Sequence, residues 1–375
     1  MNVILLNRRY CPGEAWTNRI LAYAKGLAEL GCNVTLIYLI ADEKRTLYNI
    51  QVPGVKVIDV WKDDFWLARK FRPLSYILNL RKIKRYVGKG DKVFIYNAER
   101  LILNSVKKTE ADIYAEITEH PYIYNRRGPK GELAIDRRSK RLNVLKGMSV
   151  ISRNLKSYYS TIGICDDKIS VVNMFVDGNR FKGLEKNNPD PYIAYCGILS
   201  YKKDGINTLI DSFRLFHSQH PEYKLYLIGR GETPTIIDEL RQKVASMELQ
   251  GNVIFTGPIS PEDIPGVLVN AQILALARPD NLQAQNGFPT KLGEYLATGN
   301  PVVVTKVGEI PNFLQHMDTA ILAEPNNAED FAEKLLWVAD NYDKAKKIGC
   351  RGQKLSDECF SYLSQSKVLF DLMKK

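Results

Sequence analysis

The sequence is poor in the residues that bind metals or form disulfides. It has 4 His and 6 Cys among 375 residues, and no two cysteines form a CxxC pair. Scattered thiols of this kind are typical of reduced cysteines in a cytoplasmic protein. We therefore expect neither a disulfide set nor a zinc site.

Long apolar runs are absent too. No stretch approaches the roughly 18 uninterrupted apolar residues that a bilayer-spanning helix needs. The N-terminal sequence MNVILLNRRY places Arg8 and Arg9 after its apolar run, an order that is wrong for a signal peptide and favours a first buried strand. We expect a cytoplasmic protein, and its length favours two domains.

Positive charge is concentrated in the first half of the chain. Residues 1–180 hold 32 Lys or Arg and 18 Asp or Glu, a balance of +14, whereas residues 181–375 hold 21 and 24, a balance of −3. The two balances add to the overall charge of +11. This asymmetry favours a polyanionic partner for the first half, either nucleic acid or an anionic membrane surface.

Apolar strand-like runs alternate with helical patterns in both halves. This alternation predicts an α/β protein with two doubly wound parallel-sheet domains. The polar segment GLEKNNPDP (183–191) is the expected boundary, and the last segment has a helical pattern. The expected strands are 2–7, 33–40, 55–60, 92–97, 112–118, 148–152, 169–176, 192–197, 224–229, 252–257, 272–277 and 301–304.

Glycines, basic residues and a histidine follow several of these strands. In doubly wound domains, ligands bind outside the carboxyl ends of the strands. A cleft between two such rims would suit a nucleotide with a diphosphate. The residues in question are Gly13, Glu119, His120, Lys202, Lys203, Gly205, Arg230 and Arg278.

The stretch GFPTKLGEYLATGNPVVVT (287–305) predicts a helix, a tight turn and a buried strand. Pro289 suits the first helical position, and Gly299 and Pro301 end the helix. Lys291 in the first turn opposes the helix dipole at a cost of about 0.3–1 kcal/mol, which a bound anion would reverse. Taken alone, Lys291 and Glu294 are more typical of ordinary exposed surface residues.

In their order along the chain, the motifs resemble those of the GT-B glycosyltransferases, specifically glycosyltransferase family 4. The resemblance spans nearly the whole chain. It rests on the Gly13 loop with the helix and strand that follow it, and on VISRNL, VVNMFVDGNRF, GILSYKKDGINTLIDSF, LYLIGRGE, FTGPISPEDIPGVLVNA, NGFPTKLGEYLATGNPVVVT and the terminal FSYL helix.

The resemblance implies two Rossmann-like domains facing across a cleft. Residues 1–183, with a C-terminal helix at about 360–375, would bind the acceptor, and residues 184–359 would bind a nucleotide-sugar donor. Lys203, His120 and Glu119 would serve catalysis. The implied donor-binding residues are Gly13, Gly197, Lys202, Arg230, Arg278, Asn286, Gly287, Phe288, Thr290, Lys291 and Glu294.

Within that resemblance, Glu294 would accept hydrogen bonds from the ribose hydroxyls, and Lys203 would place a point charge on the phosphates. Two positions depart from the family pattern. Asn286 stands where the family has the first Glu of its E-x7-E segment, and Ile198 stands where it often has Arg. The donor sugar could differ accordingly.

The resemblance also implies transfer with retention of anomeric configuration and no protein nucleophile, in bacterial surface polysaccharide synthesis on a glycan or lipid-linked acceptor. The sequence contains no Asp-x-Asp motif, so we expect no metal and no cofactor beside a UDP- or GDP-type sugar donor. His120 is equally typical of a turn histidine bonded to the backbone.

Segment 61–86 interleaves aromatic and cationic residues, which favours peripheral attachment to an anionic membrane at the inner face of the cytoplasmic membrane. An ordinary amphipathic helix packed on the sheet is the other interpretation. The aromatic residues of segment 61–86 are Trp61, Phe65, Trp66, Phe71 and Tyr76, and its cationic residues include Arg69, Lys70, Arg72, Arg81, Lys82, Lys84 and Arg85.

Three other functions are compatible with the sequence. An inverting GT-B transferase or a sugar-nucleotide epimerase could use Glu119 or His120 as a base. A nucleic-acid binder would explain the basic half, although no RNA-recognition motif or zinc-finger spacing is present, and we expect no nucleic-acid partner. A nucleotide sensor without activity would explain Asn286 and Ile198.

Overall fold

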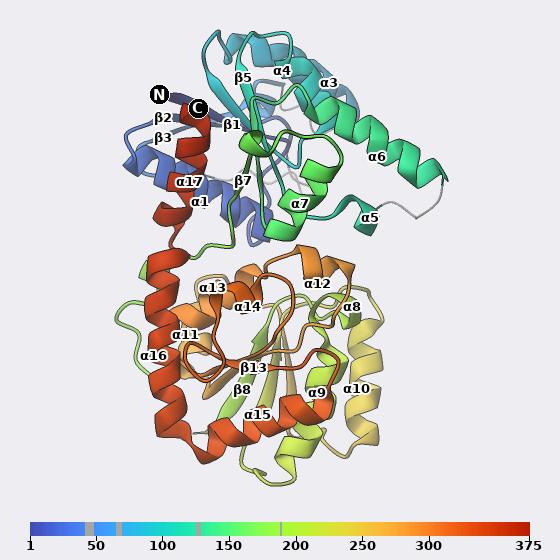
Figure 1. Cartoon of the computed structure of the whole chain (residues 1–375), viewed down its shortest axis with the longest axis vertical. Helices are drawn as coiled ribbons and strands as arrows, with labels where there is room; N and C mark the ends of the chain where they lie inside the picture. The colour runs from blue at the N-terminus through green and yellow to red at the C-terminus, as the bar shows by residue number, and fades with distance from the viewer. Residues whose placement is uncertain (42–48, 65–69, 125–128, 188–189) are drawn as a thin grey trace. The chain divides into compact units, whose positions relative to one another are not determined.

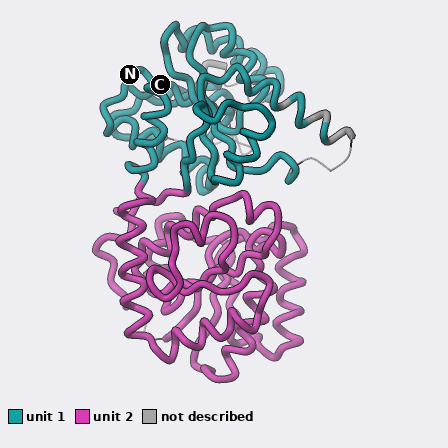
Figure 2. Tube along the Cα trace, viewed as in Figure 1, with its two compact units in different colours: residues 1–173, 362–375 teal, residues 174–361 magenta. Residues whose placement is uncertain are grey.

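The chain folds into two compact units. The computed structural model describes residues 1–41, 49–64, 70–124, 129–187 and 190–375. Unit 1 comprises Met1–Asn173 and Tyr362–Lys375, and unit 2 comprises Met174–Ser361 (Figure 2). The division falls at 173/174, whereas the sequence placed the boundary at 183/184. Residues from 174 onward belong to unit 2 because Val176 N donates to Phe360 O and Val176 forms a bridge with Ser361.

Unit 1 is built on a parallel sheet of seven strands in the order β3-β2-β1-β4-β5-β6-β7. The strands form where the apolar runs stand, and β1 is buried along almost its whole length. Runs this apolar need cover on both faces of the sheet. The strands are β1 (Asn2–Asn7), β2 (Asn33–Tyr38), β3 (Val55–Asp59), β4 (Lys92–Tyr96), β5 (Asp112–Ile117), β6 (Gly147–Val150) and β7 (Ile169–Val171).

Helices from both ends of the chain cover this sheet. The C-terminal helix α17 returns to unit 1 and packs along α1 and against β6 and β7 (Figure 1). The helices are α1 (Ala15–Glu29), α3 (Arg72–Lys82), α4 (Arg100–Val106), α5 (Pro121–Tyr124), α6 (Pro129–Leu142), α7 (Arg153–Thr161) and α17 (Tyr362–Lys374), with short 3-10 turns η1 (Val60–Asp64), η2 (Ile83–Arg85) and η3 (Asp166–Lys168).

Unit 2 repeats the plan with a six-stranded parallel sheet in the order β10-β9-β8-β11-β12-β13. Its strands are β8 (Tyr192–Cys196), β9 (Lys224–Ile228), β10 (Val253–Gly257), β11 (Ile273–Leu276), β12 (Val302–Thr305) and β13 (Ile321–Ala323). Its helices are η4 (Gly178–Phe181), α8 (Tyr201–Asp204), α9 (Ile206–His217), α10 (Ile236–Ser246), α11 (Ile264–Asn270), α12 (Leu282–Asn286), α13 (Thr290–Ala297), α14 (Ile310–Phe313), α15 (Ala328–Asp340) and α16 (Tyr342–Cys359).

The strand order reverses once within each sheet, between β1 and β4 in unit 1 and between β8 and β11 in unit 2. Both sheets are therefore doubly wound, and the prediction of two parallel-sheet domains is confirmed. In such sheets the crevice at the reversal is the usual ligand site. Among the described residues, no helix combines the length and apolarity needed to cross a bilayer.

Candidate functional site

The loops after β8 and β11 meet at the strand reversal of unit 2. Gly205 has a left-handed backbone (φ +67°), and a Cβ there would lie 1.9 Å from the carbonyl oxygen of Ala277. Only glycine permits this approach, which brings the loop after β8 directly onto the residues after β11. Figure 1 shows α8, α12 and α13 gathered at the same end of unit 2.

A buried ion pair lies at the centre of these loops. Lys291 Nζ, in the first turn of α13, donates to Asp204 Oδ2 at 2.6 Å and to the Tyr195 hydroxyl at 2.7 Å. The side chains of Lys291 and Asp204 are 15% and 2% exposed. The Tyr195 hydroxyl in turn donates to Asp204 Oδ2 or to Ile198 O, at 2.9 and 2.6 Å. Lys291 therefore has an anionic partner within the chain.

This pairing changes the expected reason for a cation at the start of α13. The sequence predicts that a bound anion balances the charge of Lys291, but the Asp204 carboxylate already does so. Pro289 is the N-cap, so the helix begins at Thr290 and not at Pro289. Asp204 belongs to the motif GILSYKKDGINTLIDSF, and nothing local to the sequence connects it with a lysine in a distant helix.

The site carries more positive than negative charge. Burial alone raises the pKa of Asp204, but Lys291, Arg278 and Lys203 outweigh burial and lower it. Burial lowers the pKa of Lys291, while Asp204 opposes that shift and Lys203 and Arg278 add to it. Three cations thus surround one carboxylate, and such an excess suits an anionic ligand.

Gly197 allows the loop after β8 to lie against this cluster. A Cβ at Gly197 would stand 2.4 Å from Lys291 Nζ and 3.1 Å from the Tyr195 hydroxyl. Any larger residue would displace the amine from Asp204. The adjoining loops are tied together as well, because Ser200 Oγ donates to Glu232 Oε2 at 2.5 Å and Asn281 Nδ2 donates to Lys202 O at 2.6 Å.

Glu294 lies one turn beyond Lys291 and pairs with an arginine that sequence reasoning missed. Arg180 Nη1 donates to Glu294 Oε1 at 2.7 Å, and Arg180 Nη2 donates to Pro261 O at 2.7 Å. Burial raises the pKa of Glu294, and Arg180 partly opposes that shift. Arg180 belongs to the motif VVNMFVDGNRF, but nothing within that motif indicates its partner on α13.

The other predicted donor residues of unit 2 differ in their surroundings. Asn286 is buried, and its Nδ2 donates to Leu282 O at 2.9 Å, while Gly287 follows α12. Thr290 is half-buried, whereas Lys202 of α8 and Arg230, which follows β9, are exposed. Phe288 packs its ring against Phe313 and Phe360 in a buried aromatic cluster, so its visible role is packing.

Three predicted residues belong to unit 1. Gly13 lies in the exposed loop after β1 with φ +79°, a conformation that favours glycine. Glu119 and His120 follow β5. His120 is buried, its Nδ1 accepts from the Tyr122 N–H at 3.3 Å, and its ring packs on Tyr122 and Tyr158.

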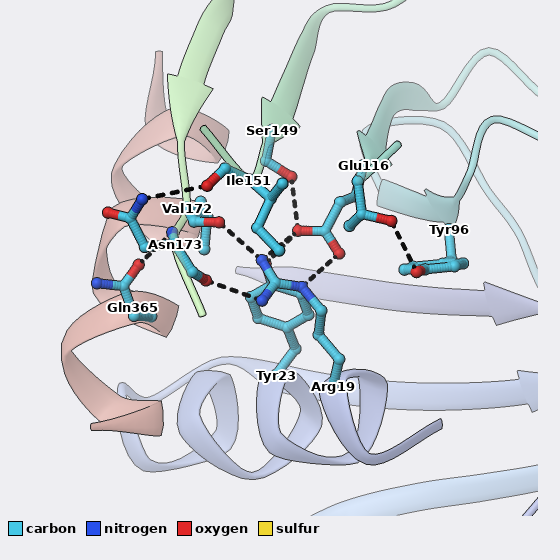
Figure 3. Close-up of polar contacts among 10 residues, drawn as sticks. Arg19, Tyr23, Tyr96, Glu116, Ser149, Ile151, Val172, Asn173 and Gln365 are labelled. Carbon is cyan, nitrogen blue, oxygen red and sulfur yellow. Dashed lines mark hydrogen bonds and ion pairs between the residues drawn. The ribbon is translucent and has the colours of Figure 1, made fainter. Parts of the chain in front are cut away.

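Unit 1 also contains a fully buried charged network that the sequence did not reveal (Figure 3). Arg19 of α1 forms two hydrogen bonds to Glu116 of β5, at 2.8 and 2.7 Å. The same guanidinium donates to the carbonyls of Val172 and Asn173, each at 2.8 Å. These carbonyls follow β7, and their capture by Arg19 explains why the strand ends at Val171, short of the expected 176.

Metal ligands do not cluster in the part of the chain that the structure describes. No group of three or more His, Cys, Asp and Glu side chains there is arranged to hold a metal ion. The described cysteines are unpaired with one another.

Part of unit 2 is similar to a known protein family. Residues 190–341 match the family model for glycosyl transferases group 1. The matched residues lie within unit 2 and make up less than half of the chain. Lys203, Asp204, Arg278, Lys291 and Glu294 all lie within the matched residues, whereas Arg180 precedes them.

Two curated relatives are similar over part of their length. Mannosylfructose-phosphate synthase of Agrobacterium fabrum is 30% identical over 131 residues, which cover 34% of this chain and 28% of that protein. The amylovoran biosynthesis glycosyltransferase AmsK of Erwinia amylovora is 26% identical over 190 residues, or 50% of this chain and 46% of that protein. The chain thus spans less than half the length of these relatives.

The fold is similar to that of HepE from Anabaena, whose structure was solved in complex with UDP and glucose. The TM-score is 0.76 at 16% identity, covering 100% of this chain and 99% of HepE. The predicted GT-B class, with two Rossmann-like domains, is therefore confirmed as the fold of this chain.

Proposed function

We propose that this protein is a retaining glycosyltransferase that moves a sugar from a nucleoside-diphosphate sugar to the hydroxyl of a glycan or lipid-linked acceptor. The observation that carries the proposal is the cationic cluster at the strand reversal of unit 2, inside the segment that matches the group 1 family. A diphosphate is the anionic part of such a donor, and Lys203, Arg278 and Lys291 would neutralise it.

The proposed chemistry needs positioning and charge rather than a protein nucleophile. The bond between the sugar C1 and the diphosphate oxygen breaks while the acceptor oxygen bonds to C1 on the same face. The acceptor proton passes to an oxygen of the departing diphosphate, whose growing charge the three cations stabilise. Because these cations come from the chain itself, we propose that no metal or other cofactor takes part.

The remaining predicted residues receive roles by the same proposal. Glu294 would accept from the ribose hydroxyls, and Asn286 would bind the donor sugar through its amide. Glu119 and His120 of unit 1 would contact the acceptor. Relatives named for amylovoran and colanic acid biosynthesis support a role in bacterial surface polysaccharide synthesis, and structures of HepE with UDP and UDP-glucose support a UDP-type donor over a GDP-type one.

A thermal-shift screen with UDP, GDP, ADP and TDP tests the donor site. We expect one nucleotide to raise the melting temperature of the wild type and Glu294→Ala to lose most of that shift, because the ribose loses its acceptor. If no nucleotide shifts the melting temperature at millimolar concentration, the transferase proposal fails and only the fold remains. Once a donor is found, the anomer of the product distinguishes retention from an inverting mechanism with Glu119 or His120 as base.

We also propose that unit 1 attaches to an anionic membrane through helix α3. Phe71, Leu74 and Ile77 are 50%, 48% and 49% exposed, an apolar row on the outer face of a helix whose other face is buried. The exposed cations Arg81 and Arg85 continue this surface. An apolar row flanked by cations matches an interfacial helix on an anionic bilayer.

Parts of the expected membrane segment have other environments. Trp61 and Tyr76 are buried, so these two aromatics cannot contact lipid in this structure. Phe65, Trp66 and Arg69 lie outside the described residues. The α3 row is thus the portion of segment 61–86 on which the proposal rests.

Co-sedimentation with vesicles tests the attachment. The wild type should bind vesicles that contain phosphatidylglycerol and bind pure phosphatidylcholine weakly, while Leu74→Glu with Ile77→Glu should abolish binding. Leu363→Glu, at an exposed apolar position on α17, is the matched control and should bind as the wild type does. Equal binding by the α3 double variant would contradict the proposal.

A further inference from the structure

Arg180 lies on the segment that opens unit 2 and is fixed by two other elements. Its guanidinium donates to Glu294 Oε1 on α13 and to Pro261 O before α11, each at 2.7 Å. The same segment approaches α13 closely, because a Cβ at Gly293 would lie 3.3 Å from the Cβ of Val176. Arg180 therefore has a defined orientation, although its side chain is 34% exposed.

The pair leaves one carboxylate oxygen of Glu294 accessible. Arg180 occupies Oε1, and within the part of the chain that the structure describes, Oε2 accepts no hydrogen bond. The Glu294 side chain is 26% exposed, so a ligand can approach it. An ionised carboxylate can accept hydrogen bonds on both oxygens at once, whereas a protonated carboxyl becomes a donor at one of them.

We propose that Arg180 is a positioning residue for the donor site: it keeps Glu294 ionised and turned so that Oε2 receives the ribose hydroxyls of a nucleoside diphosphate. This inference rests on the proposed function of the site. Arg180 itself would touch no part of the donor, and its effect would pass entirely through Glu294.

The charged and titratable groups around Glu294 support this assignment. Burial raises the pKa of Glu294, Arg180 is the strongest opposing influence, and Lys291 on the same helix adds a weaker one. Cys196 at the end of β8 and Tyr295 also face Glu294, and burial raises the pKa of both, so neither carries charge near neutral pH. Without Arg180, Glu294 would take up a proton at a higher pH.

Isothermal titration of the nucleoside diphosphate that stabilises the wild type provides the test, at pH 5.5, 6.5 and 8. For Arg180→Gln we expect binding about tenfold weaker at pH 5.5, because a protonated Glu294 accepts fewer hydrogen bonds from the ribose, and nearer to the wild type at pH 8. Arg180→Lys should restore most of the affinity. The 2′,3′-dideoxy form of the same nucleotide should bind the wild type and Arg180→Gln equally, because it has no ribose hydroxyls.

Two further variants separate positioning from general damage. Arg351→Gln removes an exposed arginine with an ion pair of the same 2.7 Å length, to Asp318, and should leave binding unchanged. In a Glu294→Gln background, Arg180→Gln should cause no additional loss. The inference is overturned if Arg180→Gln weakens binding of the dideoxy nucleotide as much as binding of the normal one, or if it weakens binding equally at every pH. In either case nucleotide binding itself stands. Failure of the wild type to bind any nucleotide would instead overturn the proposed function.

Discussion

Lys291 belongs to a buried ion pair on which we expect the stability of unit 2 to depend. Its amine is held by the Asp204 carboxylate and the Tyr195 hydroxyl, and the pair is almost completely buried. Lys291→Met would leave the carboxylate buried without its nearest counter-ion. We expect the free energy of unfolding, measured by urea denaturation, to fall by about 3–5 kcal/mol.

Two controls make this prediction specific. Lys306→Met removes an ion pair with Glu324 in which both side chains are about half exposed, and should cost at most about 1 kcal/mol. The double variant Asp204→Asn/Lys291→Met should lose less than the sum of its single variants, because the neutral amide needs no counter-ion. Strict additivity would show that the two side chains are not coupled.

The same pair predicts a dependence on pH. The pKa of Asp204 is lowered in the folded protein, so the stabilisation is complete above the unfolded value near 3.9. It is lost as the pH falls through the lower folded value. We therefore expect the difference in unfolding free energy between wild type and Lys291→Met to shrink as the pH falls below about 4 in urea titrations. A difference that grows on acidification would contradict this sign.

At the scale of elements, the Arg19 network joins α1, β5 and the chain that follows β7. Arg19→Met would leave the Glu116 carboxylate without its ion pair and would remove the donors of two carbonyls, for a loss of about 3–5 kcal/mol in urea unfolding. In Arg19→Met/Glu116→Leu the charge is gone, but the carbonyls of Val172 and Asn173 still lack their donors. We expect only partial recovery, and full recovery would show that the carbonyl bonds contribute little.

The packing of α17 on α1 depends on one glycine. A Cβ at Gly26 would stand 2.3 Å from Ser366 Oγ and 3.2 Å from the backbone oxygen of Tyr362. Gly26→Ala should therefore destabilise the protein by about 1–3 kcal/mol in spite of the better helix propensity of alanine. The matched control is Gly266→Ala in α11, where no atom lies within 4 Å of the added Cβ and a gain of up to about 1 kcal/mol is expected.

Elements such as these also show what a sequence reveals of its fold. The strands could be predicted because each is an apolar run with a turn at its end, a purely local signal. Strand β13 was missed because three residues, Ile321–Ala323, carry no period. The strand predicted over 169–176 is longer than the observed one, because its end is set by Arg19, a residue more than a hundred positions away.

Site residues followed the same rule. Lys203, Lys291 and Glu294 could be named as candidates because they stand in motifs that resemble those of a known family. Their partners could not, because Asp204 and Arg180 meet them only through the packing of loops onto α13. Complementary charges are common in any sequence, and only the fold determines which of them meet.

At the scale of the whole molecule, the two units are unequal in how the chain builds them. Unit 2 is one uninterrupted segment with its own six-stranded sheet, whereas unit 1 needs residues from both ends of the chain. Helix α17 buries Leu369, Leu372 and Met373, and Gln365 Oε1 accepts from the Asn173 N–H at 2.8 Å.

We expect residues 174–361 to fold alone and residues 1–173 to fail without α17. Burial of three large apolar side chains contributes roughly 5–9 kcal/mol at about 1.5–3 kcal/mol each. That amount is comparable with the whole stability of a typical domain, about 5–15 kcal/mol. Circular dichroism should show cooperative thermal unfolding for 174–361, and an aggregation-prone or non-cooperative state for 1–173. Joining residues 362–375 to 1–173 through a flexible linker should restore the cooperative transition, whereas cooperative unfolding of 1–173 without them would show that α17 is dispensable to unit 1.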